Sequence, residues 1–175
     1  MKLFYILLLL VFNLFAGEAV PVDEKPQVML KAISEDAIRI GTGNDKTVYM
    51  FVDPMCKFSK RLMKIINKNK MLQLTNSYYI FLYKLPKLNS EKLIQYIYQA
   101  DDKKTTLLDV MIDEEIIDFD DFKATQKTLK AIQTVADAAK KLDITIRPYI
   151  ISFEKDSKFC MVSEGEASCI EEFED

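Results

Sequence analysis

The organisation of the chain is decided by residues 48 to 59, which read Val48-Tyr49-Met50-Phe51-Val52-Asp53-Pro54-Met55-Cys56-Lys57-Phe58-Ser59. Residues 47 to 53 form a continuous β-branched and aromatic run that ends at turn residues, which is typical of a strand buried on both faces. From residue 57 to about 69, apolar side chains recur at helical spacing among lysines, which predicts an amphipathic helix. Cys56 therefore lies at the junction between a central strand and a helix.

The segments on both sides of this junction predict a mixed α/β structure. Residues 20 to 45 form a lead-in segment of helix or strand that ends in a tight turn at residues 41 to 45. A second strand is expected at residues 77 to 84. Helices follow at 90–99, at 101–117 and from Asp120 or Asp121 to about 142. In the last helix one face carries Leu129, Ile132, Ala136, Ala139 and Leu142.

The C-terminal part predicts two further strands. A strand over residues 144 to 153 is interrupted by Pro148, and a returning strand covers residues 158 to 163. The sequence shows no internal repeat and no second domain, so residues 46 to 175 are expected to form one domain.

The composition excludes several functional classes. The chain has 175 residues and no histidine, so a histidine general base, a Ser-His-Asp triad and a Cys/His zinc site are all ruled out. With 24 Lys and Arg against 27 Asp and Glu, the net charge of −3 argues against nucleic-acid binding, which needs clustered cations. No metal and no organic cofactor is implied.

The N-terminus predicts the compartment. Lys2 precedes an apolar run from residue 3 to 12, and small residues follow at 16 to 19, which is the pattern of a signal peptide over residues 1 to 19. The run is shorter than the ~20 apolar residues that cross a bilayer. An uncleaved segment that serves as an anchor is the alternative. Either way, the domain is expected in the periplasm or outside the cell, where disulfides persist.

The position of Cys56 has a chemical consequence. Unpaired N–H groups and the dipole at a helix N-terminus stabilise a negative charge, so this position favours the thiolate over the thiol. Lys57 adds a nearby cation, and the Ser59 hydroxyl, one helical turn on, can donate a hydrogen bond to the sulfur. The alternative is that Cys56 is a small buried hydrophobic residue.

Taken together, these segments resemble the thioredoxin superfamily, in particular periplasmic thiol:disulfide interchange proteins of the Dsb type. Residues 48 to 59 are similar to that family's strand, Asp-Pro turn and active-site helix start. The helix from Leu129 to Leu142 and the following Asp143-Ile144-Thr145-Ile146-Arg147-Pro148-Tyr149 are similar to its helix and cis-proline loop. Residues 86 to 128 have the length and place of its helical insertion. The resemblance implies a thioredoxin-like mixed sheet flanked by helices.

Two departures from the family pattern bear on activity. Ser59 stands where the family has the second cysteine of Cys-X-X-Cys, which leaves monothiol chemistry at Cys56. Arg147 precedes the expected cis-proline, where the family more often has a small or β-branched residue that faces the cysteine. We expect Arg147 to stabilise the thiolate, with an anion-docking role or a surface ion pair to Asp53 or Asp143 as alternatives.

The other two cysteines, Cys160 and Cys169, lie nine residues apart near the C-terminus. In an oxidising compartment, a structural disulfide between them is the simplest pairing. The competing pairing joins Cys56 to one of them as a distant resolving thiol, which would restore dithiol chemistry. The sequence alone leaves both open.

These features predict a periplasmic, monomeric protein with a catalytic group of Cys56, Ser59, Lys57 and Arg147. The loop at Ile146 and Pro148 is expected to bind the substrate by backbone pairing. Substrates would be exported proteins or peptides with thiols or disulfides, and an unidentified reductant would complete the cycle. The alternative function is a redox-inert module that binds a partner peptide.

Overall fold

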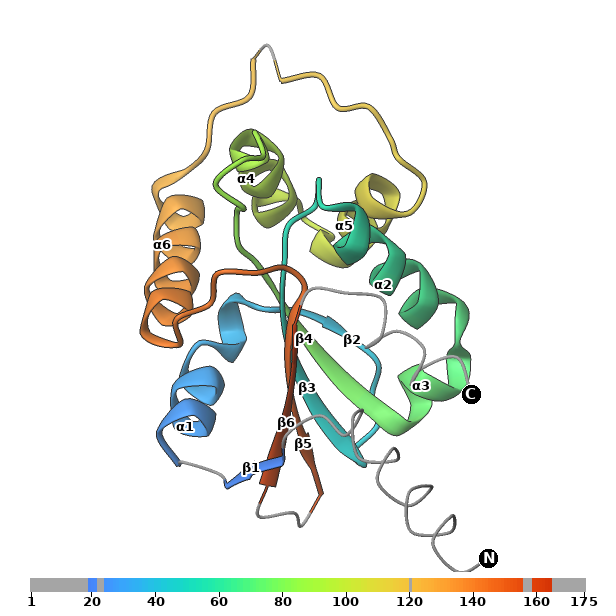
Figure 1. The fold of residues 1–175 in the computed structure, drawn as a ribbon. Coiled ribbons are helices and arrows are strands. Elements are labelled where there is room, and N and C mark those ends of the chain that lie inside the picture. Colours follow the sequence, from blue (N-terminus) through green and yellow to red (C-terminus); the bar gives the residue numbers. More distant parts are fainter. Residues whose placement is uncertain (1–18, 22–23, 120, 156–158, 165–175) are drawn as a thin grey trace, which may run out of the picture.

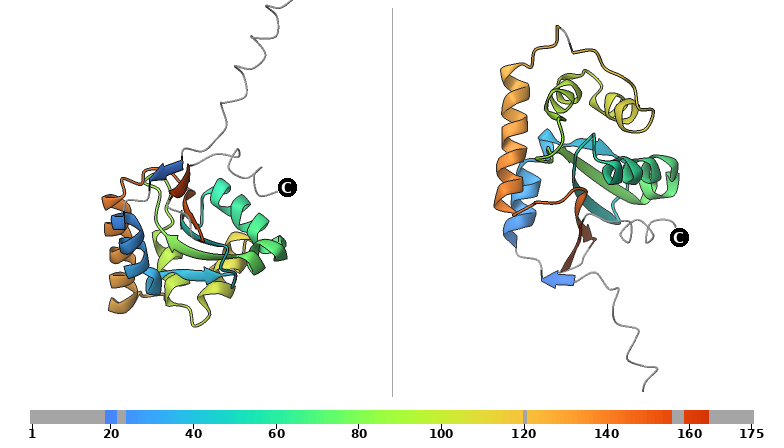
Figure 2. Two further views of the ribbon diagram at one scale, coloured as in Figure 1. Left: turned by 90° about the horizontal axis from the view of Figure 1, so that it is seen from below. Right: turned by 45° about the horizontal axis from the view of Figure 1, so that its top comes forward.

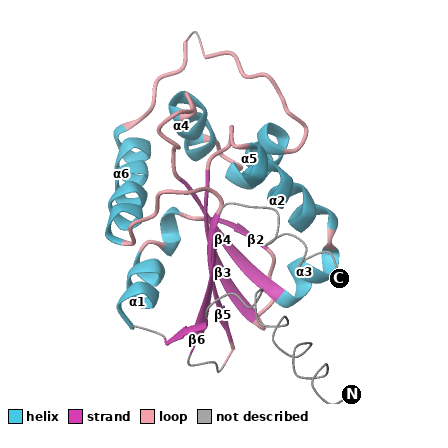
Figure 3. Ribbon diagram, viewed as in Figure 1, coloured by secondary structure: helices cyan, strands magenta, loops and turns pink. Residues whose placement is uncertain are grey.

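The computed structural model describes residues 19–21, 24–119, 121–155 and 159–164. Along the chain it contains β1 (Ala19–Pro21), α1 (Glu24–Ala32), the short 3-10 helix η1 (Ser34–Asp36), β2 (Ile38–Ile40), β3 (Lys46–Val52), α2 (Lys57–Lys68), α3 (Lys70–Thr75), β4 (Asn76–Leu82), α4 (Glu91–Gln99), α5 (Lys103–Met111), α6 (Gln126–Lys141), β5 (Tyr149–Glu154) and β6 (Phe159–Glu164). Figure 3 shows these helices and strands along the chain.

A single mixed sheet forms the centre of the structure. Its six strands follow the order β1-β6-β5-β3-β4-β2. The central strand β3 runs parallel to β4 on one side and antiparallel to β5 on the other (Figure 1). This confirms the predicted thioredoxin-like fold, and it confirms that the strand before Cys56 is central.

Helices cover both faces of this sheet and create two hydrophobic cores. In the right-hand view of Figure 2, α1 and α6 lie on one side of the sheet and α2 and α3 on the other. The first core packs side chains of α1 and α6, such as Leu30 and Val135, against Phe51. The second packs α2, α4 and α5 against the opposite face of the sheet. Because β3 alternates between these two cores, its last five residues are all buried.

The lead-in segment is built into this sheet. β2 pairs antiparallel with β4, and β1 pairs antiparallel with β6. The expected tight turn joins β2 to β3, and it packs closely against the start of β4. Gly41 has a φ of 78°, and a Cβ there would collide with the carbonyl oxygen of Asn76. This position therefore requires glycine.

The helical insertion between β4 and α6 is docked by a buried tyrosine. α4 and α5 lie within it, and the Tyr98 hydroxyl of α4 accepts a hydrogen bond of 2.9 Å from the Leu82 N–H at the end of β4. Burial raises the pKa of Tyr98, with its hydrogen bond to Leu82 acting in the opposite direction. The hydroxyl stays protonated and ties the insertion to the sheet.

Three element boundaries differ from the sequence expectations. α5 ends at Met111 rather than near residue 117, and Glu114 follows with a φ of 58°. α6 begins at Gln126, because the Thr125 hydroxyl caps it by accepting from the Thr128 N–H. Within α6 the buried face includes Val135, Ala138 and Ala139, whereas Leu129 is 38% exposed.

The third difference concerns the strand predicted over residues 144 to 153. β5 begins only at Tyr149, because the preceding residues form a loop that includes a left-handed Asp143 and a proline without an N–H. The expected signal peptide over residues 1 to 19 lies outside the described residues except for Ala19. Within the described part of the chain, no helix combines the length and the apolar character needed to span a membrane.

Candidate active site

Cys56 is the residue that joins β3 to α2. It occupies the position just before the first turn of α2, where its carbonyl accepts the Lys60 N–H and its own N–H donates to the Asp53 carbonyl at 3.0 Å. The side chain is 7% exposed, and its thiol donates to the carbonyl oxygen of Arg147 at 3.6 Å. Two segments 91 residues apart in sequence therefore meet at the sulfur atom.

The peptide bond between Arg147 and Pro148 is cis, as expected from the sequence. This loop lies between α6 and β5, and β5 is the antiparallel neighbour of β3. The sheet therefore holds the cis-proline loop next to the start of α2. Cys56 contacts this loop through the main chain of Arg147.

The surroundings of Arg147 differ from the two alternatives to thiolate stabilisation, an anion-docking role and a surface ion pair to Asp53 or Asp143. The side chain is 3% exposed, and its guanidinium donates to the carbonyl oxygens of Tyr83, Lys84, Ile144 and Ile146 at 3.1 to 3.3 Å. It also stacks on the Tyr83 ring, 3.9 Å from the ring centroid. Its donors are therefore occupied by main-chain acceptors, and it joins the cis-proline loop to the segment after β4.

Burial lowers the pKa of the Arg147 guanidinium below its ordinary value. The neighbouring Tyr83, Asp53 and Cys56 act on this pKa in the opposite direction. The guanidinium still carries its charge at neutral pH, since arginine starts from a very high pKa. Arg147 therefore places a buried positive charge near Cys56, although the two side chains form no ion pair.

Asp53 has a structural role at this site that the sequence did not predict. The carboxylate is fully buried and accepts hydrogen bonds from the Met55 N–H at 2.8 Å, the Leu85 N–H at 2.6 Å and the Ser90 hydroxyl at 2.8 Å. These donors belong to the turn before Cys56 and to the segment that leads into α4. Asp53 therefore fixes both segments that border the cysteine. The signal available in the sequence was a carboxylate at the end of a buried strand.

Ser59 and Lys57 extend the site along the first turn of α2. Ser59 is fully buried, and its hydroxyl oxygen accepts from the Asp53 N–H at 3.4 Å. This bond differs from the expected hydrogen bond to the Cys56 sulfur. Lys57 is exposed, and its ammonium lies 4.8 Å from the centroid of the Phe58 ring. Lys57 therefore places a positive charge at the surface, whereas the buried Ser59 hydroxyl binds the main chain of Asp53.

A groove of about 1010 Å³ opens at Cys56. Its lining consists of Met55, Cys56, Lys57, Phe58, Leu85, Pro86, Lys87, Leu88, Thr145, Ile146 and Arg147. Met55 and Ile146 are 46% and 44% exposed, so the groove presents large apolar side chains to solvent. The lining contains lysines but no acidic residue. The groove therefore suits an apolar or anionic polypeptide segment.

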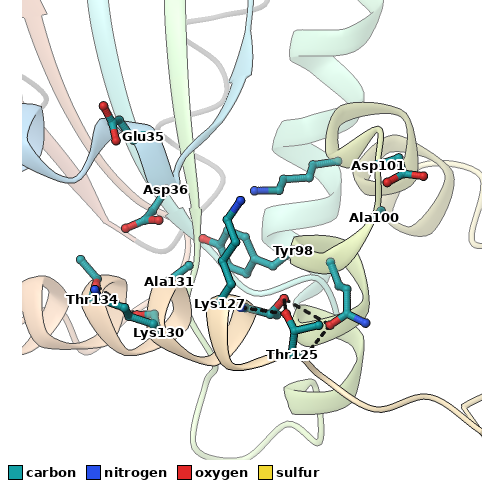
Figure 4. A pocket seen from close by; sticks show the side chains of 13 residues that line it. Glu35, Asp36, Tyr98, Ala100, Asp101, Thr125, Lys127, Lys130, Ala131 and Thr134 are labelled. Carbon is teal, nitrogen blue, oxygen red and sulfur yellow. Dashed lines mark hydrogen bonds between the residues drawn. The ribbon is translucent and has the colours of Figure 1, made fainter.

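A second cavity of about 760 Å³ lies between η1, the end of α4 and the first half of α6 (Figure 4). Its lining carries equal numbers of positive and negative side chains, namely Lys103, Lys127 and Lys130 and Glu35, Asp36 and Asp101. Burial raises the pKa of Asp36, and the nearby Lys103 opposes that shift. The cavity shares no lining residue with the groove at Cys56, and its balanced charge indicates no particular class of ligand.

The remaining predicted site residues give less information. Among the described residues, no group of three or more His, Cys, Asp or Glu could hold a metal ion. Pro148 lies beside the groove but is not part of its lining. The backbone of Cys160 lies in β6, whereas its side chain and the whole of Cys169 lie outside the described part of the chain. The predicted Cys160–Cys169 disulfide therefore also lies outside it.

Comparison with known proteins places this geometry in a known fold. No protein-family model and no curated protein sequence matches this chain. Among solved structures, the chain is similar to the catalytic domain of Proteus mirabilis ScsC, at 19% identity and a TM-score of 0.61 over 85% of this chain and 94% of that one.

Two further solved structures share the fold. The first is a disulfide interchange protein from Neisseria gonorrhoeae, at 16% identity and a TM-score of 0.57 over 81% of this chain and 95% of that one. The second is a periplasmic thioredoxin-like protein from Salmonella enterica serovar Typhimurium, at 13% identity and a TM-score of 0.51 over 88% of this chain and 96% of that one. This chain thus has the thioredoxin fold of the Dsb-type proteins.

Proposed function

We propose that the protein is a periplasmic monothiol thioredoxin-like protein that acts through Cys56 on disulfides or oxidised cysteines of exported proteins. The observation that carries this proposal is the position of Cys56 at the N-terminus of α2, against the cis-proline loop and at the wall of an apolar groove. The similarity to a disulfide interchange protein and to a periplasmic thioredoxin-like protein supports it.

The chemistry starts from the Cys56 thiolate. Three sources of positive charge lie close to this residue: the N-terminus of α2, the Lys57 ammonium and the Arg147 guanidinium. The thiolate attacks one sulfur of a substrate disulfide, which forms a mixed disulfide and releases the other sulfur as a thiolate. With a sulfenic acid as substrate, the same attack forms the mixed disulfide and expels hydroxide, which takes a proton from solvent to become water.

Ser59 determines how the cycle continues. Because it stands one turn after Cys56 and carries no thiol, the mixed disulfide persists until another thiol attacks it. Isomerisation meets this condition when the attacking thiol belongs to the substrate itself. Reduction meets it when an outside reductant supplies the thiol.

The cis-proline loop and the groove would hold the substrate. An extended segment can pair with the main chain beside Pro148, while Ile146 and Met55 contact apolar side chains on either side of the reacting cysteine. The proposal also includes export of the protein through a signal peptide over residues 1 to 19, and it includes a monomeric state.

A redox-inert binding module is the second candidate, and one observation favours it. The Cys56 thiol is 7% exposed and already donates to the Arg147 carbonyl, as a structural cysteine would. In this case the groove would bind a peptide without any covalent step.

Trapping of mixed disulfides separates the two candidates. Periplasmic extract is passed over the immobilised, reduced protein, and bound proteins are eluted first with salt and then with a reductant. We expect partners that only the reductant releases, and we expect Cys56→Ser to lose them while its circular dichroism is unchanged. Cys160→Ser is the matched control and should keep them. If Cys56→Ser retains the same partners, the binding module is correct.

A further inference from the structure

We propose that the protein selects substrate polypeptides that carry acidic residues next to the reactive cysteine, and that a basic stripe on α2 binds these residues together with Lys87. The basic stripe consists of Lys57, Arg61, Lys64 and Lys68. This inference rests on the proposed function and names the class of substrate that the same site takes.

The charge of the chain is unevenly distributed along its sequence. The whole chain has a net charge of −3, yet residues 54 to 90 contain no acidic residue. The same segment holds eight of the 24 Lys and Arg residues. It includes Cys56, all of α2 and α3, and Lys87. The segment that carries the reactive cysteine is therefore strongly positive, opposite in sign to the chain as a whole.

The basic stripe runs along α2 from the residue next to Cys56. Its members are spaced by four, three and four residues, and residues so spaced lie on one face of a helix. Lys57, Arg61 and Lys68 are exposed, and Lys64 is half-buried. At about 1.5 Å per residue, the stripe is about 17 Å long. An extended polypeptide covers this length with about five residues.

The stripe is continuous with the groove at Cys56, because Lys57 belongs to both. The segment after β4 contributes a second cation, Lys87, to the groove. Most of the other side chains that line the groove are apolar, and none of its described lining residues carries a carboxylate. A bound polypeptide can therefore place its cysteine and apolar side chains in the groove while its acidic side chains lie at Lys87 and along the stripe.

A carboxylate of the chain itself already contacts this stripe. Glu114, in the loop after α5, accepts a hydrogen bond of 3.2 Å from the Lys64 ammonium. This hydrogen bond and the charges of Lys60 and Lys64 lower the pKa of Glu114. Both side chains of the pair are exposed, so a substrate carboxylate can compete for Lys64. Among the described residues, no other member of the stripe forms an ion pair.

An acidic polypeptide fits this surface better than an anionic membrane does. A helix that lies in a membrane interface places large apolar side chains in the lipid. In α2 the large apolar side chains instead pack in the core, where Leu62, Met63 and Ile66 are buried. The exposed face of α2 therefore presents charge without the apolar side chains that anchor a helix in lipid.

The test compares how fast Cys56 reacts with two peptides that differ only in charge. Each peptide carries one cysteine in a disulfide with thiopyridine, apolar residues beside it, and either Glu or Gln at the flanking positions on both sides. Cys56 attacks the peptide sulfur, which forms a mixed disulfide with the peptide and releases the pyridine thiolate. This thiolate takes a proton from solvent to give thiopyridone, which is measured by its absorbance. The purified, reduced full chain is used, and the rate of Cys56→Ser is subtracted as the blank.

We expect the Glu peptide to react about ten-fold faster than the Gln peptide at low salt, and we expect added salt to reduce this ratio. The ratio cancels any change in the intrinsic reactivity of Cys56. Arg61→Gln and Lys87→Gln should each lower the ratio about two- to five-fold, as expected for the loss of one exposed ion pair. Lys155→Gln is the matched control and should leave the ratio unchanged. Lys155 is exposed and follows β5 at the end far from the cis-proline loop.

The outcomes separate this inference from the proposed function. If both peptides react at the same rate at every salt concentration, the inference is wrong, although Cys56 is still an active nucleophile. The inference is equally wrong if the two rates agree and the protein sediments with phosphatidylglycerol vesicles, because the stripe then binds a membrane. Absence of thiopyridone release above the Cys56→Ser blank with either peptide would overturn the proposed function itself.

Discussion

Arg147 offers the sharpest test of how the site is held together. Its guanidinium donates to four main-chain carbonyls from two separate segments, the end of the β4 strand region and the cis-proline loop. Arg147→Met keeps much of the apolar stem but removes every donor. Arg147→Lys keeps the charge but cannot reach four acceptors from one ammonium. The two variants therefore separate the contribution of the charge from that of the hydrogen bonds.

The expected loss of stability follows from these bonds. Hydrogen bonds to a charged group contribute about 1.5–3 kcal/mol each, so four of them give a gross value of about 6–12 kcal/mol. Burial of a guanidinium that is 3% exposed costs several kcal/mol in return. We therefore expect Arg147→Met to lower the free energy of unfolding by about 2–5 kcal/mol. Arg147→Lys should lose less, because one or two acceptors keep a charged donor.

Urea denaturation followed by circular dichroism measures this difference. With a slope of about 2 kcal/mol per molar urea, Arg147→Met should lower the midpoint by about 1–2.5 M at an unchanged slope. In urea-free buffer, the rate of Cys56 alkylation should fall in Arg147→Met and stay closer to wild type in Arg147→Lys. A midpoint within about 0.3 M of wild type would refute the reasoning on hydrogen bonds. Equal alkylation rates in all three proteins would refute the electrostatic part.

Three further predictions concern other parts of the structure. Asp53→Asn places an amide NH₂ donor against the buried donors that now bind a carboxylate oxygen, so it should lower the free energy of unfolding by about 2–4 kcal/mol in urea denaturation. Ser90→Ala removes one of the three donors to Asp53 and should lower the same free energy by only about 1–1.5 kcal/mol. Burial raises the pKa of Asp36 in the folded protein, so the ionised carboxylate destabilises the fold at pH values above the unfolded-state pKa of about 3.9. Asp36→Asn should therefore raise the melting temperature at pH 7. This gain should vanish when the same melt is run near pH 3, where the carboxyl group is protonated in both states. Gly41→Ala should cost about 2–4 kcal/mol in the same assay, since its left-handed φ and the adjacent Asn76 carbonyl leave no room for a methyl group; a neutral result would contradict the turn geometry.

The sequence alone predicted the helices and strands whose spacing of apolar residues reflects which side chains are buried. The continuous apolar run of β3 predicted a strand buried on both faces, and the helical spacing after Cys56 predicted α2. The starts of α5 and α6 were not predictable to the residue, since they depend on which polar side chain caps the helix. Asp102 caps α5 and Thr125 caps α6, although several neighbouring residues could have served.

The site was predictable in position but not in its interior contacts. Cys56 and the cis-proline loop followed from the strand-to-helix junction and from the family resemblance. The contacts of Arg147 did not, because an arginine in a loop is usually solvated and the sequence does not show which carbonyls lack partners. Asp53 was missed for the same reason: its donors come from residues up to 37 positions away and converge only in the folded chain.

Two buried charges of opposite sign therefore border the same cysteine. The ion pairs within the described part of the chain join Lys46 to Glu154, Lys64 to Glu114 and Lys84 to Glu91, so none joins Asp53 to Arg147. Each buried charge is instead hydrogen-bonded mainly to neutral main-chain groups, which solvate the charge without cancelling it. A carboxylate disfavours a nearby thiolate, whereas a guanidinium favours it.

This arrangement gives opposite expectations for two substitutions that both destabilise the protein. Asp53→Asn removes the negative charge and should speed Cys56 alkylation near neutral pH, whereas Arg147→Met removes the positive charge and should slow it. If the two residues acted only by supporting the loops, both substitutions would loosen the site and shift the rate in the same direction. Alkylation rates measured side by side across pH 5 to 9 distinguish these cases. Shifts of the same sign would show that packing, rather than charge, controls the reactivity of this cysteine.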